Sequence, residues 1–242
     1  MNLKFNRLFL VVANLYLWYM GLILNLETAT TNCSVSLARA GEVIAIKENN
    51  TPKYSHAEQL HVFISECIAE VDVSLADLDA VAVSKGPGSY TGLRIGVSAA
   101  KGLCFSLDIP LISIATLTSM ASQAIGNYDY IIPVLDARRM EVYSAVFDRD
   151  LTQIRSTEAE IIDVHSFGLF TKNKTVHILG SGAQKIVETL SSGFISYDTE
   201  CVPSSREMAL LSYQKYLKND FEDVAYFEPY YLKDFMLQTK KK

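Results

Sequence analysis

Acidic and hydroxyl side chains stand at the ends of two apolar, strand-like segments. Glu27 ends the segment 22–27 and Thr28 follows it, whereas Asp136 ends the segment 130–136. Ligands of α/β proteins bind mainly outside the carboxyl ends of strands. Glu27, Thr28 and Asp136 are therefore candidates for binding a ligand or cofactor; the alternative is that they only solvate the strand ends.

A glycine-rich loop, KGPGSYTG over 85–92, connects a predicted strand to a predicted helix. The N–H groups at a helix N-terminus attract anions, which makes Gly88 and Ser89 candidates for phosphate binding. The loop matches neither GxxxxGK[ST] nor a clean GxGxxG, and a tyrosine stands where a nucleophile elbow would carry serine. In the alternative interpretation, the glycines only shape a tight turn and let the helix approach the sheet.

Two histidines occur on one predicted helix at a spacing that does not favour metal binding. His56 and His61 are five residues apart, whereas helical neighbours are three or four apart. The two rings therefore point about 140° away from each other. The helical zinc motif HExxH needs i and i+4, so no metal site and no catalytic residue is predicted.

The helix predicted over 93–107 has an unusual composition. Its charged residues are Arg94 and Lys101, seven apart on one stripe, and five of its residues are Gly, Ala or Ser between 96 and 102. A helix with so little polar surface is not simply lying in water. One side should cover a sheet, and the others should meet the helix 55–71 and a second protein. A helix buried wholly within its own chain is the alternative.

The first half of the chain predicts an antiparallel meander followed by alternating strands and helices. Continuous apolar runs are typical of strands buried on both faces of a sheet. Strands that alternate with helices indicate an α/β fold. The predicted strands are 22–27, 33–38, 42–47, 80–84 and 109–114, and the predicted helices are 55–71, 93–107 and 116–125.

The second half repeats the opening of the first. Glu27 and Asp136 are 109 residues apart in the sequence, and Cys33 and Val142 are also 109 residues apart. Strand, acid, turn and strand therefore recur in one register, which indicates a duplicated domain. Further predicted elements are the strands 130–136, 142–147 and 176–179 and the helices 183–190 and 204–217.

Composition excludes several classes of protein. The chain has 242 residues, 49% of them apolar, 20% charged, and a net charge of −5. These values exclude a disordered or collagen-like chain, and the acidity argues against a stand-alone nucleic-acid binder. The four cysteines form no CxxC pair, so they indicate reduced, buried thiols in a cytoplasmic protein.

Residues 1–19 stand apart from the predicted fold. Lys4 and Arg7 precede a short apolar run, as in a signal peptide, but the run is too short to span a bilayer. We expect an N-terminal extension with Met20 as the functional start, and no membrane association. The expected lobes are 20–122 and 123–242.

The order of these motifs resembles that of one family, the tRNA threonylcarbamoyladenosine biosynthesis protein TsaB, also called YeaZ. The segments that carry the resemblance are LILNLETATTNCSVSL, SHAEQL, KGPGSYTGLRIGVSAAKGL, IPLISIATL, VLDARRMEVYSAVF and EPYYL. The family's first strand commonly ends in Ile-Asp-Thr-Ala, whereas Glu27 replaces the aspartate here. This change puts strong independent ATPase activity in doubt.

The resemblance implies an actin-like, Hsp70-like fold of two duplicated lobes and a non-catalytic scaffold. The scaffold would activate a TsaD-type transferase that modifies adenosine beside the tRNA anticodon, joined by a TsaE-type ATPase. It would touch tRNA only through this complex, and a homodimer through the same helices stays open. The expected partner interface comprises His56, Leu60, Phe63, Arg94, Val97, Ala100 and Lys101.

Two alternatives are kept beside the scaffold hypothesis. An ATP-dependent kinase or ATPase of the same superfold would clamp phosphates with Glu27, Asp136 and the glycine-rich loop. A metallopeptidase is disfavoured by the histidine spacing. No tightly bound cofactor is expected, although ATP or ADP at the interface of the complex stays open.

Overall fold

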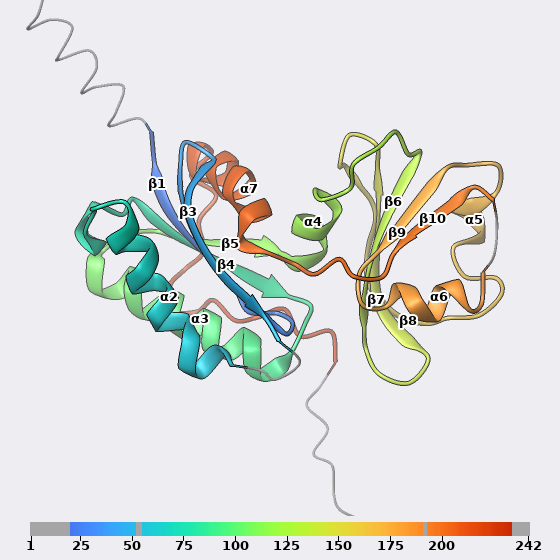
Figure 1. Cartoon of the computed structure of the whole chain (residues 1–242), viewed down its shortest axis with the longest axis horizontal. Helices are drawn as coiled ribbons and strands as arrows, with labels where there is room; N and C mark the ends of the chain where they lie inside the picture. Colours follow the sequence, from blue (N-terminus) through green and yellow to red (C-terminus); the bar gives the residue numbers. More distant parts are fainter. Residues whose placement is uncertain (1–19, 52–54, 191–192, 234–242) are drawn as a thin grey trace, which may run out of the picture.

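The computed structural model describes residues 20–51, 55–190 and 193–233, and the predicted extension 1–19 lies outside them. The described chain forms two lobes that lie side by side, each built around a five-stranded mixed sheet (Figure 1). None of the helices in these ranges is long and apolar enough to cross a membrane.

The first sheet has the strand order β3-β2-β1-β4-β5. Its first three strands form the predicted antiparallel meander, and β4 and β5 add to β1 in parallel. Central strands are buried on both faces, which explains their continuous apolar runs. The strands are β1 (Leu22–Glu27), β2 (Asn32–Arg39), β3 (Glu42–Asn50), β4 (Ala80–Gly86) and β5 (Leu111–Ala115).

Helices cover both faces of the first sheet (Figure 1). Leu24 of β1 belongs to the core beneath α2 (His56–Glu70) and α3 (Tyr90–Leu107). The next residue towards the N-terminus, Ile23, packs with Met208 of α7 (Ser205–Leu217) on the opposite face. Successive side chains of a strand point to opposite faces, so β1 contributes to both layers. A short 3₁₀ helix, Leu75–Asp77, precedes β4.

The second sheet repeats the first, with the order β10-β9-β6-β7-β8. β6 takes the place of β1: it pairs antiparallel with β7 and parallel with β9, and β8 pairs antiparallel with β7 at the sheet edge. The predicted α/β fold of two duplicated lobes is therefore confirmed. The strands are β6 (Tyr130–Asp136), β7 (Glu141–Asp148), β8 (Gln153–Ile161), β9 (Val176–Leu179) and β10 (Ile195–Asp198), and the helices are α5 (Gly168–Thr171) and α6 (Ala183–Val187).

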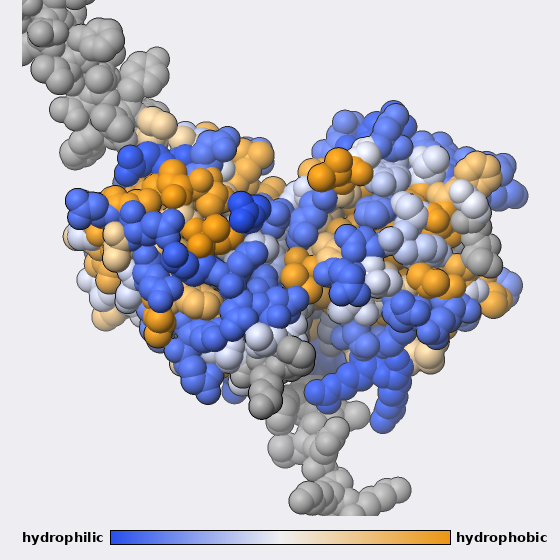
Figure 2. All heavy atoms as spheres, in the orientation of Figure 1, coloured by the Kyte–Doolittle hydropathy of each residue, from blue (hydrophilic) through white to orange (hydrophobic). Residues whose placement is uncertain are grey.

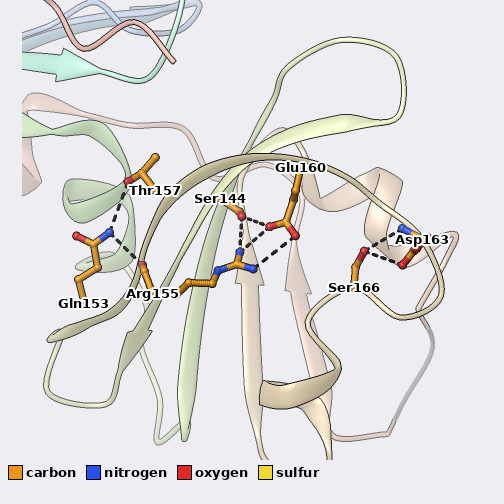
Figure 3. A network of polar contacts seen from close by, with 7 residues as sticks. All are labelled: Ser144, Gln153, Arg155, Thr157, Glu160, Asp163 and Ser166. Atoms are coloured by element: carbon orange, nitrogen blue, oxygen red, sulfur yellow. Dashed lines mark hydrogen bonds and ion pairs between the residues drawn. The ribbon is translucent and has the colours of Figure 1, made fainter. Parts of the chain in front are cut away.

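A half-buried ion pair within β8 is bound to a serine of β7 in the second lobe (Figure 3). Nη2 of Arg155 lies 2.5 Å from Oε1 of Glu160 and 2.6 Å from Oγ of Ser144. The guanidinium also lies 5.0 Å from the centre of the Phe167 ring. Polar and charged residues dominate β8, so no apolar pattern predicted this strand.

The chain passes between the lobes twice, after α4 (Thr116–Ala121) and again before α7. Gln123 joins the two passages, because its Nε2 donates to the carbonyl of Val202 at 2.8 Å. α7 returns to the first sheet and contacts β1, β2 and β5. The predicted division, with all of 123–242 in the second lobe, is therefore wrong for α7. The prediction failed because the first sheet has a second apolar face, which α7 covers with Met208.

Candidate functional site

The glycine-rich loop is occupied by the chain's own turn between β1 and β2. The N–H of Ser89 donates to the carbonyl of Ala29 at 2.6 Å. The hydroxyl of Ser89 accepts from the N–H of Gly92 at 3.3 Å and so caps α3. The N–H groups of Ser89 and Gly92 at this helix N-terminus are therefore used within the lobe.

Close approach of this turn explains two of the glycines. A Cβ on Gly88 would lie 2.4 Å from the carbonyl oxygen of Ala29. A Cβ on Gly92 would lie 2.1 Å from the carbonyl oxygen of Thr28. Real Cβ atoms essentially never come this close to another heavy atom. The sequence left open whether the glycines bind phosphate or permit close packing, and the structure shows close packing.

Glu27 lies beneath the same turn and is fully buried. Its Oε1 accepts a hydrogen bond from the N–H of Ala29 at 2.6 Å, which fixes the turn. Burial raises the pKa of Glu27 to about 7, although hydrogen bonds from Ala29 and Ser84 oppose this shift. The hydroxyl of Thr28 is buried as well. Both side chains act inside the lobe rather than towards solvent.

Asp136 ends β6 in the second lobe, as predicted, and is exposed. Its Oδ1 accepts from Nζ of Lys185 at 2.8 Å and from the N–H of Arg138 at 2.5 Å. Among the described residues, no hydrogen bond or ion pair joins Asp136 to Glu27 or Thr28. The structure therefore does not assemble the candidate residues into one phosphate clamp.

A nucleotide phosphate does not fit the loop as it stands. It would have to displace the Ala29 carbonyl from the N–H of Ser89 and move the turn that Gly88 admits. We derive no ATPase or kinase step from these residues. In the described part of the chain, no group of three or more His, Cys, Asp or Glu side chains is arranged to hold a metal ion.

The outer face of α2 and α3 carries an open groove of about 550 Å³. α2 and α3 lie side by side on the first lobe (Figure 1), and Figure 2 shows apolar residues scattered among polar ones over these helices. Val62 on α2 is 51% exposed, and Phe105 near the end of α3 is 85% exposed. The residues that line the groove are His61, Arg94, Ile95, Ser98, Ala99, Gly102 and Leu103. We call this surface the α2–α3 face.

The predicted interface residues divide between the lobe's interior and its surface. His56, Leu60, Val97 and Ala100 are buried in the lobe, so placing them at a partner interface is wrong. Nε2 of His56 lies 2.7 Å from the carbonyl oxygen of Thr30, and burial lowers the pKa of the imidazole.

Three of the predicted interface residues are at least partly exposed to solvent. Arg94 is exposed, and Phe63 and Lys101 are half-buried. Nζ of Lys101 donates to the carbonyls of Ala225 and Phe227 at 3.0 Å. Lys101 therefore binds the chain's own C-terminal segment.

Most of the residues that line the groove were not predicted from the sequence. Ile95, Ala99, Gly102 and Leu103 recur with helical spacing at i, i+4, i+7 and i+8, which places them on one stripe of α3. The stripe was visible in the sequence. The composition of α3 could not show which of its stripes faces the sheet.

Fold and site together define a two-lobed α/β protein with a closed glycine-rich loop and an open helical face. The family model of TsaD, tRNA N6-adenosine threonylcarbamoyltransferase, matches residues 50–239. The curated tRNA threonylcarbamoyladenosine biosynthesis protein TsaB of Escherichia coli K12 is 32% identical over 223 residues, covering 88% of this chain and 94% of the relative. TsaB of Bacillus subtilis 168 is 31% identical over 224 residues, covering 87% and 93%.

The chain belongs to the TsaB (YeaZ) family. Its fold is also that of YeaZ from Pseudomonas aeruginosa, with a TM-score of 0.76 at 22% identity over 88% of this chain and 100% of that one.

Proposed function

We propose that this chain takes part in tRNA threonylcarbamoyladenosine biosynthesis as a non-catalytic subunit that activates a TsaD-type transferase. The names of the relatives support the pathway, and the match to the TsaD family model supports a partner of related fold. The observation that carries the scaffold role is the α2–α3 face, where Ile95 and Leu103 line an open groove and the same two helices expose Val62 and Phe105. Apolar centres with few charges are typical of protein interfaces.

In this proposal the TsaD-type subunit packs its own helices against α2 and α3. Gly102 offers the sharpest test, because a Cβ there would meet no atom of the described residues within 4 Å. Gly102→Leu should therefore fill the groove without disturbing the lobe. The matched control is Gly168→Leu, a glycine in the second lobe that also has open space around it.

Binding of the purified TsaD-type subunit is measured by isothermal titration calorimetry, with circular dichroism as the check on folding. We expect Gly102→Leu to weaken binding at least tenfold and Gly168→Leu to leave it unchanged. Reconstituted tRNA modification should fall in step with binding. Equal binding by the two folded variants would contradict docking at this face.

A TsaE-type ATPase joins this complex in the proposal, and tRNA is contacted only through the assembly. ATP or ADP, where it binds, belongs to the assembled complex, because the glycine-rich loop of this chain is closed by Ala29. Calorimetric titration of ATP should give no heat with this chain alone. The proposed location is the cytoplasm, consistent with four buried free cysteines.

A further inference from the structure

The segment 222–233, which we call the C-terminal strap, is bound to the first lobe at several points. The N–H of Glu222 donates to the carbonyl of Leu111 at 2.8 Å, at the edge of β5. Lys101 of α3 holds two strap carbonyls, and the N–H of Tyr230 donates to the carbonyl of Lys85 at 2.7 Å. Lys233 then pairs with Glu141 of the second lobe. The strap thus runs along α3 and reaches across to β7.

One residue of the strap contacts the α2–α3 face directly. The hydroxyl of Tyr231 lies 3.4 Å from Nε of Arg94, and the Tyr231 ring lies 4.9 Å from the ring of Tyr90. The guanidinium of Arg94 lies 4.3 Å from the centre of the Tyr90 ring. Arg94 is exposed and lines the groove, yet two aromatic side chains hold it in one place.

The guanidinium keeps donors for a further ligand. Arginine has five N–H donors, and the contact with Tyr231 involves Nε. Within the described residues Arg94 forms no ion pair with a carboxylate; Glu228 on the strap acts on it only as a nearby charge. The residues lining the groove include His61 and Arg94 and no acid. A planar guanidinium held by aromatic rings is suited to bidentate binding of a carboxylate.

We propose that the C-terminal strap is part of the docking face: Tyr231 holds Arg94 so that it binds a carboxylate of the TsaD-type partner. The inference rests on the proposed function and deepens it. An orienting hydrogen bond lowers the cost of ordering a long side chain on binding, so its loss should weaken the complex. The strap residue acts through Arg94 and is a positioning residue.

The test compares Tyr231→Phe with Tyr226→Phe, a control on the same strap whose side chain is 83% exposed. Dissociation constants for the TsaD-type subunit are measured by calorimetry at low and high salt. Loss of one orienting hydrogen bond should weaken binding about three- to tenfold for Tyr231→Phe, with no change for Tyr226→Phe. Arg94→Ala should weaken binding at least tenfold and reduce the salt dependence.

A double-mutant cycle separates positioning from a general structural effect. In the Arg94→Ala background, Tyr231→Phe should have no further effect, because its role acts through the guanidinium. An equal loss in both backgrounds, or equal binding by the two tyrosine variants, would overturn the inference while leaving the docking proposal intact. If the wild-type chain bound no TsaD-type subunit, or used this face to bind a second copy of itself, the proposed function would fail first.

Discussion

Replacement of Gly92 by alanine tests whether the glycine-rich loop exists for close packing. The added Cβ would lie 2.1 Å from the carbonyl oxygen of Thr28 and 3.2 Å from Cδ2 of His56. The backbone carbonyl must move by roughly 1 Å or more to reach ordinary contact distance. Overpacking of this kind costs about 1–3 kcal/mol. The better helix propensity of alanine, at most about 1 kcal/mol, offsets only part of this cost.

Gly102→Ala is the matched control, since Gly102 lies in the same helix and an added Cβ there would have no atom within 4 Å in the described part of the chain. The control should gain up to about 1 kcal/mol from helix propensity alone. The two substitutions therefore have opposite expected signs. Urea unfolding followed by circular dichroism should show a lower midpoint for Gly92→Ala, and a higher one for Gly102→Ala, at unchanged m-value.

The same pair distinguishes packing from ligand binding. If Gly92 served to admit a phosphate, alanine would leave the stability of the free protein nearly unchanged and would lower nucleotide affinity instead. A Gly92→Ala protein as stable as Gly102→Ala would refute the assignment of the loop to internal packing.

Two further outcomes follow from the acidic candidates. Burial raises the pKa of Glu27 from 4.5 to about 7, so the folded state binds the proton more tightly than the unfolded state. The free energy of unfolding should therefore fall by about 3 kcal/mol as pH rises from about 4.5 to 7. Urea midpoints measured over this pH range should decrease in the wild-type protein and stay nearly constant in Glu27→Gln. An equal decrease in both proteins would count against the buried carboxyl as its cause. Asp136→Asn removes an ion pair with Lys185, in which the carboxylate is 45% exposed. The free energy of unfolding should therefore fall by at most about 1 kcal/mol, measured as a small decrease in the melting temperature. A larger loss would mean that Asp136 holds the second lobe together.

Most elements were predictable because they follow from local periodicity. The meander of β1, β2 and β3 has tight turns and strand-forming residues, and β6 repeats β1 with an acid at its end. β8 escaped prediction because its residues alternate between partly covered and exposed positions, without an apolar stripe. Such a strand is stabilised by its neighbour β7, which the sequence of β8 does not reveal.

The candidate site was only partly predictable, since a helix with small residues on several sides does not show which side faces the sheet. Val97 and Ala100 were expected at a partner interface but are buried against the lobe's own core. Arg94 was expected there and is exposed. Its partner Tyr231 is 137 residues away in the chain, a contact that no local pattern encodes.

The sequence by itself determined most of the elements, the duplication and the family, because periodicity and motif order are local properties that can be recognised without knowledge of packing. Only the tertiary structure decided what fills the glycine-rich loop, where α7 lies and which stripe of α3 stays open. These features depend on surfaces that meet from distant parts of the chain. Ala29 reaches the loop only because β1 and β4 are paired in one sheet.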